Sequence, residues 1–129
     1  MLKLQDVHHI AIICSDYERS KKFYTEILGL EIIREVFRQE RNSYKLDLAM
    51  NGNYVIELFS FPNPPKRVSR PEAMGLRHLA FSVEDLDHCA SFLKSKEVKV
   101  EPINVDETTG KRFTFIADPD GLPLEFYEK

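Results

Sequence analysis

Two histidines and two glutamates recur at nearly the same spacing in the two halves of this chain. His9 precedes Glu57 by 48 positions, and His78 precedes Glu125 by 47 positions. Two imidazoles and two carboxylates suit a borderline divalent cation such as Zn²⁺, Ni²⁺, Co²⁺ or Mn²⁺. Such a set can leave coordination positions open, so that the metal acts as a Lewis acid on a substrate carbonyl. One of the two glutamates could then take a proton, provided its pKa suits that task.

The segments around these residues repeat as well. Residues 7–16 (VHHIAIICSD) are echoed by residues 76–85 (LRHLAFSVED), an offset of 69 positions that also relates Phe23 to Phe92. A shared offset of this kind indicates an internal repeat, so we expect two copies of one fold unit.

Alternation along the expected strands separates two faces. Side chains alternate across a strand, so His9 shares a face with the small Ala11, whereas the bulky Ile12 points the other way. The second copy repeats this arrangement around His78. We therefore expect the bulky face to pack on helices and the histidine face to line a cavity. His8 is one position out of phase and is expected to face away.

Glu57 and Glu125 each lie between large apolar neighbours of opposite parity. A carboxylate in the middle of a sheet is costly unless something compensates it, and a divalent cation would compensate two at once. The alternative is an ion pair with Arg112 or another base, without a catalytic role. Arg112 and Thr114 share a parity in the strand expected over 111–117, and both are candidates to reach the cavity.

Each half is expected to follow the order β-α-β-β-β. The expected strands cover 7–14, 30–38, 43–50, 53–61, 76–83, 97–105, 111–117 and 122–128, with helices from a capping box at Ser15 to Gly29 and from near Asp85. Asn51-Gly52 is typical of a type I′ hairpin turn. Four prolines within 62–75 predict a linker, because proline cannot donate to a sheet ladder. We expect modules over 1–61 and 76–129, which together form one domain.

Bulk composition excludes several classes of protein. The net charge of −3 argues against a general nucleic-acid binder, whose phosphate contacts need a basic excess. No apolar run approaches the roughly 20 residues of a membrane helix, and no signal peptide is expected. Cys14 and Cys89 are expected to be buried thiols rather than a disulfide, which favours a cytoplasmic location.

Taken together, the motifs resemble the vicinal oxygen chelate (VOC) superfamily. Within it the chain is similar to glyoxalase I (lactoylglutathione lyase), and most closely to the YaeR subgroup. The resemblance implies an α+β protein with two βαβββ modules, the glyoxalase/bleomycin resistance/dioxygenase fold, curled around a metal site. It rests on His9 with Asp16, Phe23-Tyr24, Leu28-Gly29, Val55-Ile56-Glu57-Leu58, residues 78–83, and Asp118-Pro119-Asp120-Gly121 before Glu125.

The resemblance also implies a site. It assigns His9, Glu57, His78 and Glu125 as ligands of one divalent metal ion, Zn or Ni first, with Co, Mn or Fe also compatible. It implies Glu125 as the catalytic base and Glu57 as its counterpart. It further implies a homodimer, because such proteins often build each site from modules of two chains. Whether a site lies within one chain or across two stays open.

Two positions depart from the family pattern. Glutathione-binding relatives carry Arg four residues after the first ligand His and Asn four residues after the first ligand Glu. This chain has Ile13 and Phe61 there. Arginine and isoleucine are not exchangeable as partners of an anion, so we expect a more apolar pocket. Whether glutathione is the cosubstrate therefore stays open.

The expected function is that of a metal-dependent, glyoxalase I-like lyase or isomerase, which abstracts a proton next to the carbonyl of a small hemithioacetal-type substrate. Other VOC enzymes are alternatives, namely an acyl-thioester epimerase or a dioxygenase. Dioxygenases of this superfamily typically use two His and one carboxylate, so Glu57 as a fourth ligand counts against them. A non-catalytic metal- or ligand-binding module is the alternative of another class.

Overall fold

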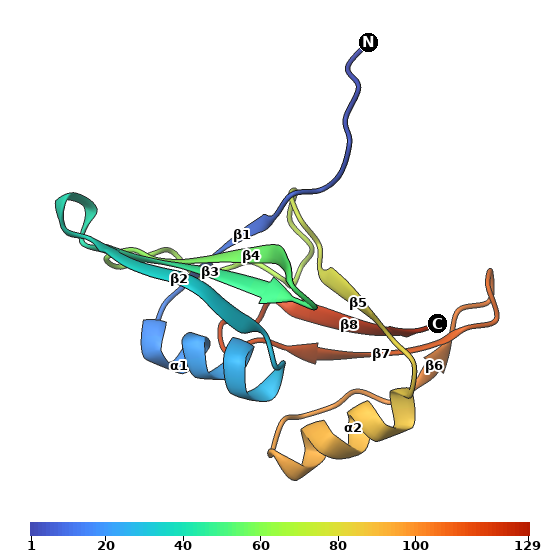
Figure 1. Cartoon of the computed structure of the whole chain (residues 1–129). Helices are drawn as coiled ribbons and strands as arrows, with labels where there is room; N and C mark the ends of the chain where they lie inside the picture. Colours follow the sequence, from blue (N-terminus) through green and yellow to red (C-terminus); the bar gives the residue numbers. More distant parts are fainter. The chain divides into compact units, whose positions relative to one another are not determined.

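The computed structural model describes all 129 residues, which divide into two compact units, Met1–Pro65 and Lys66–Lys129. Each unit contains a four-stranded mixed sheet and a helix that follows its first strand (Figure 1). The expected α+β class with two βαβββ modules is thus confirmed. No helix is long and apolar enough to cross a membrane.

The first unit has its strands in the order β1-β4-β3-β2, with β1 parallel to β4 and the other pairs antiparallel. Asn51 and Gly52 have φ angles of 52° and 81°, the positive values that the predicted type I′ turn requires. The elements are β1 (Ile10–Cys14), α1 (Tyr17–Lys22), a π-helical turn (Phe23–Ile27), β2 (Glu31–Arg38), a 3-10 turn (Gln39–Arg41), β3 (Ser43–Met50) and β4 (Asn53–Ser60).

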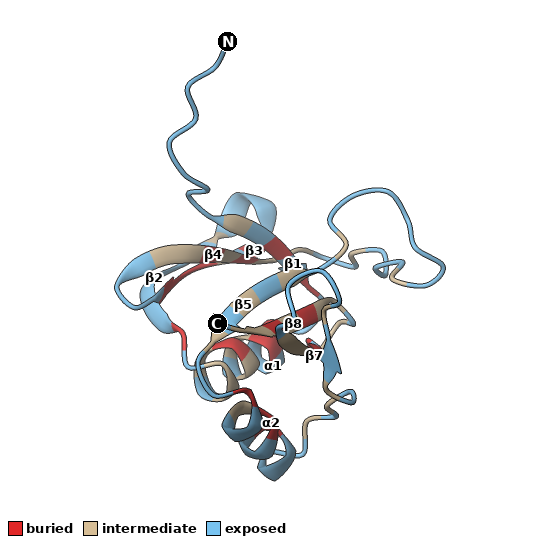
Figure 2. Cartoon of the chain, turned by 90° about the vertical axis from the view of Figure 1, so that its right-hand side faces the viewer, coloured by how far each residue is buried: buried red, intermediate tan, exposed pale blue.

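One face of this sheet packs on α1 and the other is open. Tyr17 of α1 stacks on Tyr44 of β3 with 4.2 Å between ring centres, and Leu58 on the same face is fully buried. Ala11 and Ile13, on the opposite face of β1, are exposed. Figure 2 shows buried positions along the strands and in the helix. The predicted packing of the bulky face on a helix is confirmed for this unit.

The second unit repeats the topology in the order β5-β8-β7-β6, with β5 parallel to β8. Its helix begins after Asp85, whose side chain accepts a hydrogen bond from the backbone N–H of His88 at 2.9 Å, as expected of an N-cap. The elements are β5 (Leu79–Val83), α2 (Leu86–Ser95), β6 (Asn104–Val105), β7 (Arg112–Ala117) and β8 (Pro123–Glu128).

Several element boundaries differ from the sequence-based prediction. The N-cap of α1 is Asp16, which accepts from the backbone N–H of Arg19, and not Ser15. The strand expected over 97–105 shortens to the two residues of β6. Pro102 falls in this stretch and has no N–H to donate to a sheet ladder.

Strands β1 and β5 begin directly after the histidines instead of three residues earlier. In the parallel register, His9 would lie opposite Val55, where the pairing of β4 with β3 shifts by one residue. His78 would lie opposite Pro123, which lacks an N–H. Each histidine is therefore the residue immediately before the first residue of a strand.

Candidate metal centre

The first histidine and glutamate lie side by side in the first unit. Ala11 of β1 pairs with Glu57 of β4, and His9 precedes Ala11 by two positions on the same edge. The Nε2 atom of His9 is 3.7 Å from Oε1 of Glu57. The side chain of His9 is 35% exposed and that of Glu57 is 15% exposed, so the pair borders the open face.

The second unit reproduces this pair. Ala80 of β5 pairs with Glu125 of β8, and Nε2 of His78 is 3.6 Å from Oε1 of Glu125. The exposed fractions, 34% and 15%, also match those of the first pair. The repeated spacing in the sequence thus corresponds to a repeated geometry.

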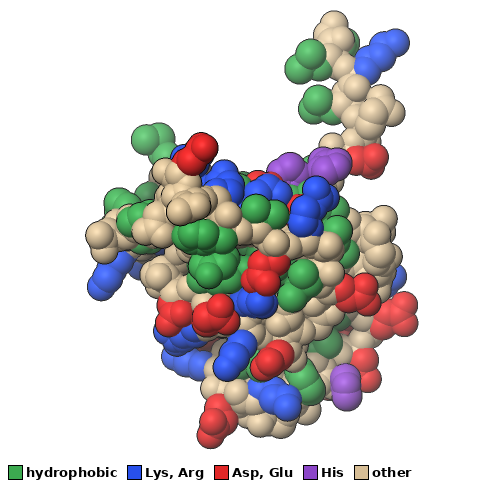
Figure 3. All heavy atoms as spheres, turned by 60° about the vertical axis from the view of Figure 1, so that its left-hand side comes forward, with side chains coloured by type: hydrophobic (Ala, Val, Ile, Leu, Met, Phe, Trp, Pro, Cys, Tyr) green, Lys and Arg blue, Asp and Glu red, His purple; other side chains and the backbone are tan.

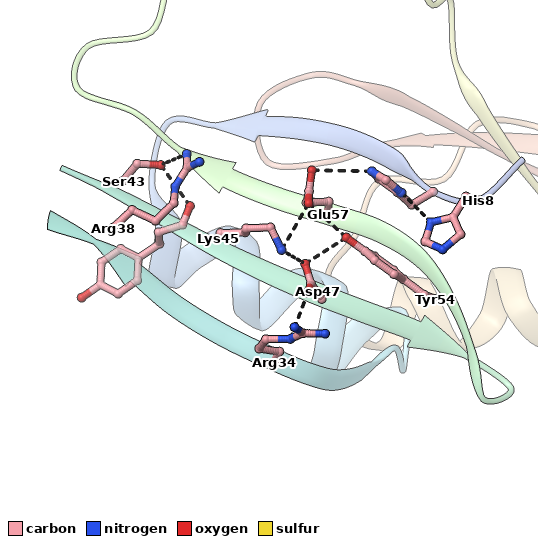
Figure 4. Close-up of polar contacts among 10 residues, drawn as sticks. His8, Arg34, Arg38, Ser43, Lys45, Asp47, Tyr54 and Glu57 are labelled. Carbon is pink, nitrogen blue, oxygen red and sulfur yellow. Dashed lines mark hydrogen bonds and ion pairs between the residues drawn. The ribbon is translucent and has the colours of Figure 1, made fainter. Parts of the chain in front are cut away.

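The second carboxylate oxygen of Glu57 is held by two donors. Lys45 Nζ lies 3.2 Å from Oε2, and the Tyr54 hydroxyl lies 3.1 Å from the same atom. Figure 4 shows these side chains pointing toward one another from β3 and β4. The predicted alternative, an ion pair of Glu57 with some base, therefore holds for this oxygen, whereas Oε1 faces His9.

Asp47 accepts hydrogen bonds from the same two donors and so fixes their positions. Its side chain is only 2% exposed, and it accepts hydrogen bonds from Lys45 at 2.7 Å and from Tyr54 at 2.9 Å. The guanidinium of Arg34 lies 3.5 Å away. Burial favours the neutral acid, but the hydrogen bonds of Lys45 and Tyr54 outweigh it and hold the pKa of Asp47 below its usual value.

Burial, and then the hydrogen bond to Asp47, raise the pKa of Tyr54 far above its ordinary value. The hydrogen bond to Asp47 is also the largest cause that raises the pKa of Lys45. Near neutral pH, Tyr54 therefore remains a hydroxyl donor and Lys45 a cation beside Glu57.

Glu125 has an aromatic residue in place of these polar neighbours. Phe115 of β7 occupies the position opposite Glu125 that Asp47 occupies opposite Glu57. The Phe115 ring packs edge-on against His78 with 5.1 Å between ring centres. No side chain donates a hydrogen bond to Glu125, so the two glutamates stand in different environments.

His8 does not face away as predicted. Its Nδ1 atom lies 2.8 Å from Nδ1 of His9, and its ring packs edge-on against Tyr54. The prediction fails because His8 precedes β1, so strand alternation does not govern its direction. Figure 3 shows imidazole atoms at the surface near the N-terminal segment, beside side chains of both charges.

Arg112 and Thr114 do not lie on the face of the sheet that carries Glu125. Arg112 pairs with Asp87 of α2 and with Glu128, both within 2.9 Å, and Thr114 is buried. The register places Phe115, of the opposite parity, next to Glu125. The prediction that Arg112 and Thr114 share the face of the site was therefore wrong.

Sequence reasoning missed Lys45, Asp47 and Tyr54. The alternation of residues 45–48 (KLDL) indicates that Lys45 and Asp47 share one face of a strand. Which face that is depends on the register with β4, which the sequence pattern does not reveal.

Each pair offers one imidazole nitrogen and one carboxylate oxygen, donor types that suit divalent transition metals. No group of three or more His, Cys, Asp or Glu side chains gathers at metal-binding distance. Each unit thus holds two such donors side by side, and both carboxylates are largely shielded from water. The donor chemistry fits a divalent metal ion.

Comparison with known proteins gives close relatives over the whole chain. The family model described as Glyoxalase/Bleomycin resistance protein/Dioxygenase superfamily matches residues 6–126. The uncharacterised protein YaeR of Escherichia coli (strain K12) is 64% identical and covers 100% of both chains. The crystal structure of a glyoxalase family protein from Enterococcus faecalis has a TM-score of 0.90 at 48% identity, over 96% of this chain and 98% of that one.

More distant relatives carry enzymatic names. A probable lactoylglutathione lyase of Synechocystis sp. (strain ATCC 27184 / PCC 6803 / Kazusa) is 30% identical, over 93% of this chain and 92% of its own. A 2-epi-5-epi-valiolone epimerase of Actinomyces sp. is 29% identical, over 92% of this chain and 76% of its own.

Proposed function

Since the chain belongs to the glyoxalase/bleomycin resistance protein/dioxygenase superfamily, we propose that it is a metal-dependent lyase or isomerase of glyoxalase I type. The observation that carries the proposal is the matched pair geometry, with Nε2–Oε1 distances of 3.7 Å for His9–Glu57 and 3.6 Å for His78–Glu125. These four side chains are the proposed ligands of one divalent ion, Zn or Ni first. They come from one chain or from two copies in a homodimer.

The bound metal would polarise the carbonyl of the substrate, so that the adjacent carbon loses its proton more easily. The two glutamates have different tasks in this proposal. Lys45 and Tyr54 hold Oε2 of Glu57 in place and balance its charge. Glu125 has no hydrogen-bond donor on its second oxygen, so that oxygen can accept the proton. Glu125 is therefore the proposed base.

The activity test supplies methylglyoxal, glutathione and Ni²⁺ or Zn²⁺ to the metal-free protein and measures lactoylglutathione. The similarity to a probable lactoylglutathione lyase supports this choice of substrate. Product formation that depends on the metal is the expected result. Tight metal binding without product, for every divalent ion tried, would reject this substrate and favour a non-catalytic binding module.

An epimerase is the second candidate, supported by the relative named as an epimerase. Epimerisation also begins with removal of a proton next to a carbonyl, so the same base would serve. Exchange of that proton with deuterated solvent, without formation of lactoylglutathione, would favour this candidate.

Light scattering of the purified protein tests the proposed homodimer.

A further inference from the structure

Two arginines of the first unit lie against aromatic rings. The guanidinium of Arg38, at the end of β2, is 4.7 Å from the ring centre of Phe59 and 5.7 Å from that of Phe61. Arg41, in the 3-10 turn that follows, lies 5.3 Å from the ring centre of Phe61. The two phenylalanine rings stack with 5.6 Å between their centres. Two positive charges thus lie against the stacked rings of Phe59 and Phe61, which we call the aromatic platform.

These charges have no acidic partner. No carboxylate lies within 4.0 Å of Arg38 or Arg41, whereas Arg34 and Arg112 each pair with one. One Nη of Arg38 donates to Ser43 at 2.9 Å, but its Nε is buried without a hydrogen-bond partner. A buried donor without an acceptor costs free energy, and a bound anion would supply the acceptor.

Arg38 also lies on the face that carries Glu57. Phe59 follows Glu57 by two positions in β4 and pairs with Lys45 of β3. Arg38 pairs with Ser43, which stands two positions before Lys45. Two residues of a strand span about 7 Å, so a small molecule can reach from Glu57 to the aromatic platform.

We infer that Arg38 and Arg41 form a subsite for an oxyanion of the substrate, a carboxylate or a phosphate group. The inference rests on the proposed function, because it assigns the subsite to the molecule that reacts beside Glu57. A guanidinium over a ring keeps its edge available for hydrogen bonds to such a group. Phe61, which departs from the family pattern, is the ring that both guanidinium groups share in this subsite.

The test measures anion binding by the metal-free, full-length protein at low ionic strength. Inorganic phosphate and succinate are titrated while the arginine Nε–H signals are followed by NMR, and the tighter probe identifies the kind of anion. Arg38→Met and Arg41→Met are each expected to weaken binding about tenfold, because each loses a charge-assisted hydrogen bond. Arg19→Met, an exposed α1 position without a carboxylate partner, is the control and should bind as the wild type does.

Arg41 is exposed, so its variant keeps the test decisive even if Arg38→Met does not fold. Equal affinity of the wild type and both variants for both probes would overturn the subsite. The lyase assay is independent of this result. Anion binding that depends on Arg38 and Arg41 in a protein without lyase activity would reject the proposed function alone. Lyase activity without anion binding would reject the subsite alone.

Discussion

The phenol ring of Tyr54 lies flat against the imidazole of His9, with 4.9 Å between ring centres and 9° between ring planes. At the same time its hydroxyl reaches the carboxylates of Asp47 and Glu57. One side chain therefore orients both members of the first histidine–glutamate pair. The second pair has no counterpart of this contact, since Phe115 meets His78 edge-on.

Tyr54→Phe keeps the ring and removes the hydroxyl. We expect a loss of about 1–2 kcal/mol in the free energy of unfolding, because the buried Asp47 loses a hydrogen bond. Urea denaturation measures this change. Tyr44→Phe is the matched control. The Tyr44 ring stacks on Tyr17, and the Tyr44 hydroxyl makes no hydrogen bond that the substitution would remove. A Tyr54→Phe protein as stable as the control would show that the hydroxyl contributes nothing.

Lys45→Met removes a cation next to the buried Asp47. We expect the free energy of unfolding to fall by roughly 2 kcal/mol, because the remaining partners of Asp47 compensate part of its charge. The second unit suggests a rescue, because it has Phe113 and Phe115 at the equivalent positions. The double variant Lys45→Met/Asp47→Leu should therefore be more stable than Lys45→Met alone. Additive losses in thermal unfolding would contradict this coupling.

Glu57→Gln and His78→Ala are each expected to reduce the metal content of the purified protein. Each substitution removes or weakens one of four donors for a divalent ion. Elemental analysis after dialysis against Zn²⁺ or Ni²⁺ gives the stoichiometry. His88→Ala, at an exposed position of α2, should leave the metal content unchanged. A full complement in both ligand variants would show that the four-ligand assignment is wrong.

Glu125→Gln should lower kcat by about 10²–10⁴-fold at saturating metal, the usual contribution of a general base. Glu57→Gln should lower it less, since Lys45 and Tyr54 already hold that carboxylate. Steady-state kinetics with the substrate found active compares the two variants. A larger effect of Glu57→Gln would exchange the roles of the two residues.

Glu35 gives the protein a pH-dependent contribution to stability. The hydrogen bond from Lys21, at 2.7 Å, and a second one from Tyr17 lower the pKa of Glu35. A lowered pKa means that the stabilisation is present above the unfolded-state pKa of about 4.3 and is lost as pH falls through the folded-state value.

Glu35→Gln should therefore flatten the decline of the melting temperature below about pH 4.3. Melting curves between neutral and acidic pH measure this. Glu26→Gln, at an exposed position without an ion pair, should leave the decline unchanged. If the melting temperature fell equally with pH in the wild type and in Glu35→Gln, Glu35 would make no pH-dependent contribution to stability.

Local pattern predicted most of the fold. Strand β3 has the predicted bounds, because Asn51-Gly52 sets its end through the positive φ angles that both residues adopt. Strand β6 did not follow the prediction, since strand formation there depends on pairing with β7 as well as on local sequence. The direction of His8 was missed for a related reason, because alternation applies only to residues paired in a strand.

The sequence by itself determined that there are two copies of one unit, each with a histidine and a glutamate on the face opposite the bulky apolar side chains. Repetition and a period of two are local properties, so they can be read without knowing the pairing. Tertiary structure alone decided what surrounds Glu57. A simple hairpin at Asn51-Gly52 would place Leu46 opposite Glu57, but the one-residue shift beside Val55 places Asp47 there. A slip of one residue exchanges the two faces of a strand, and that slip brought Lys45, Asp47 and Tyr54 to the site.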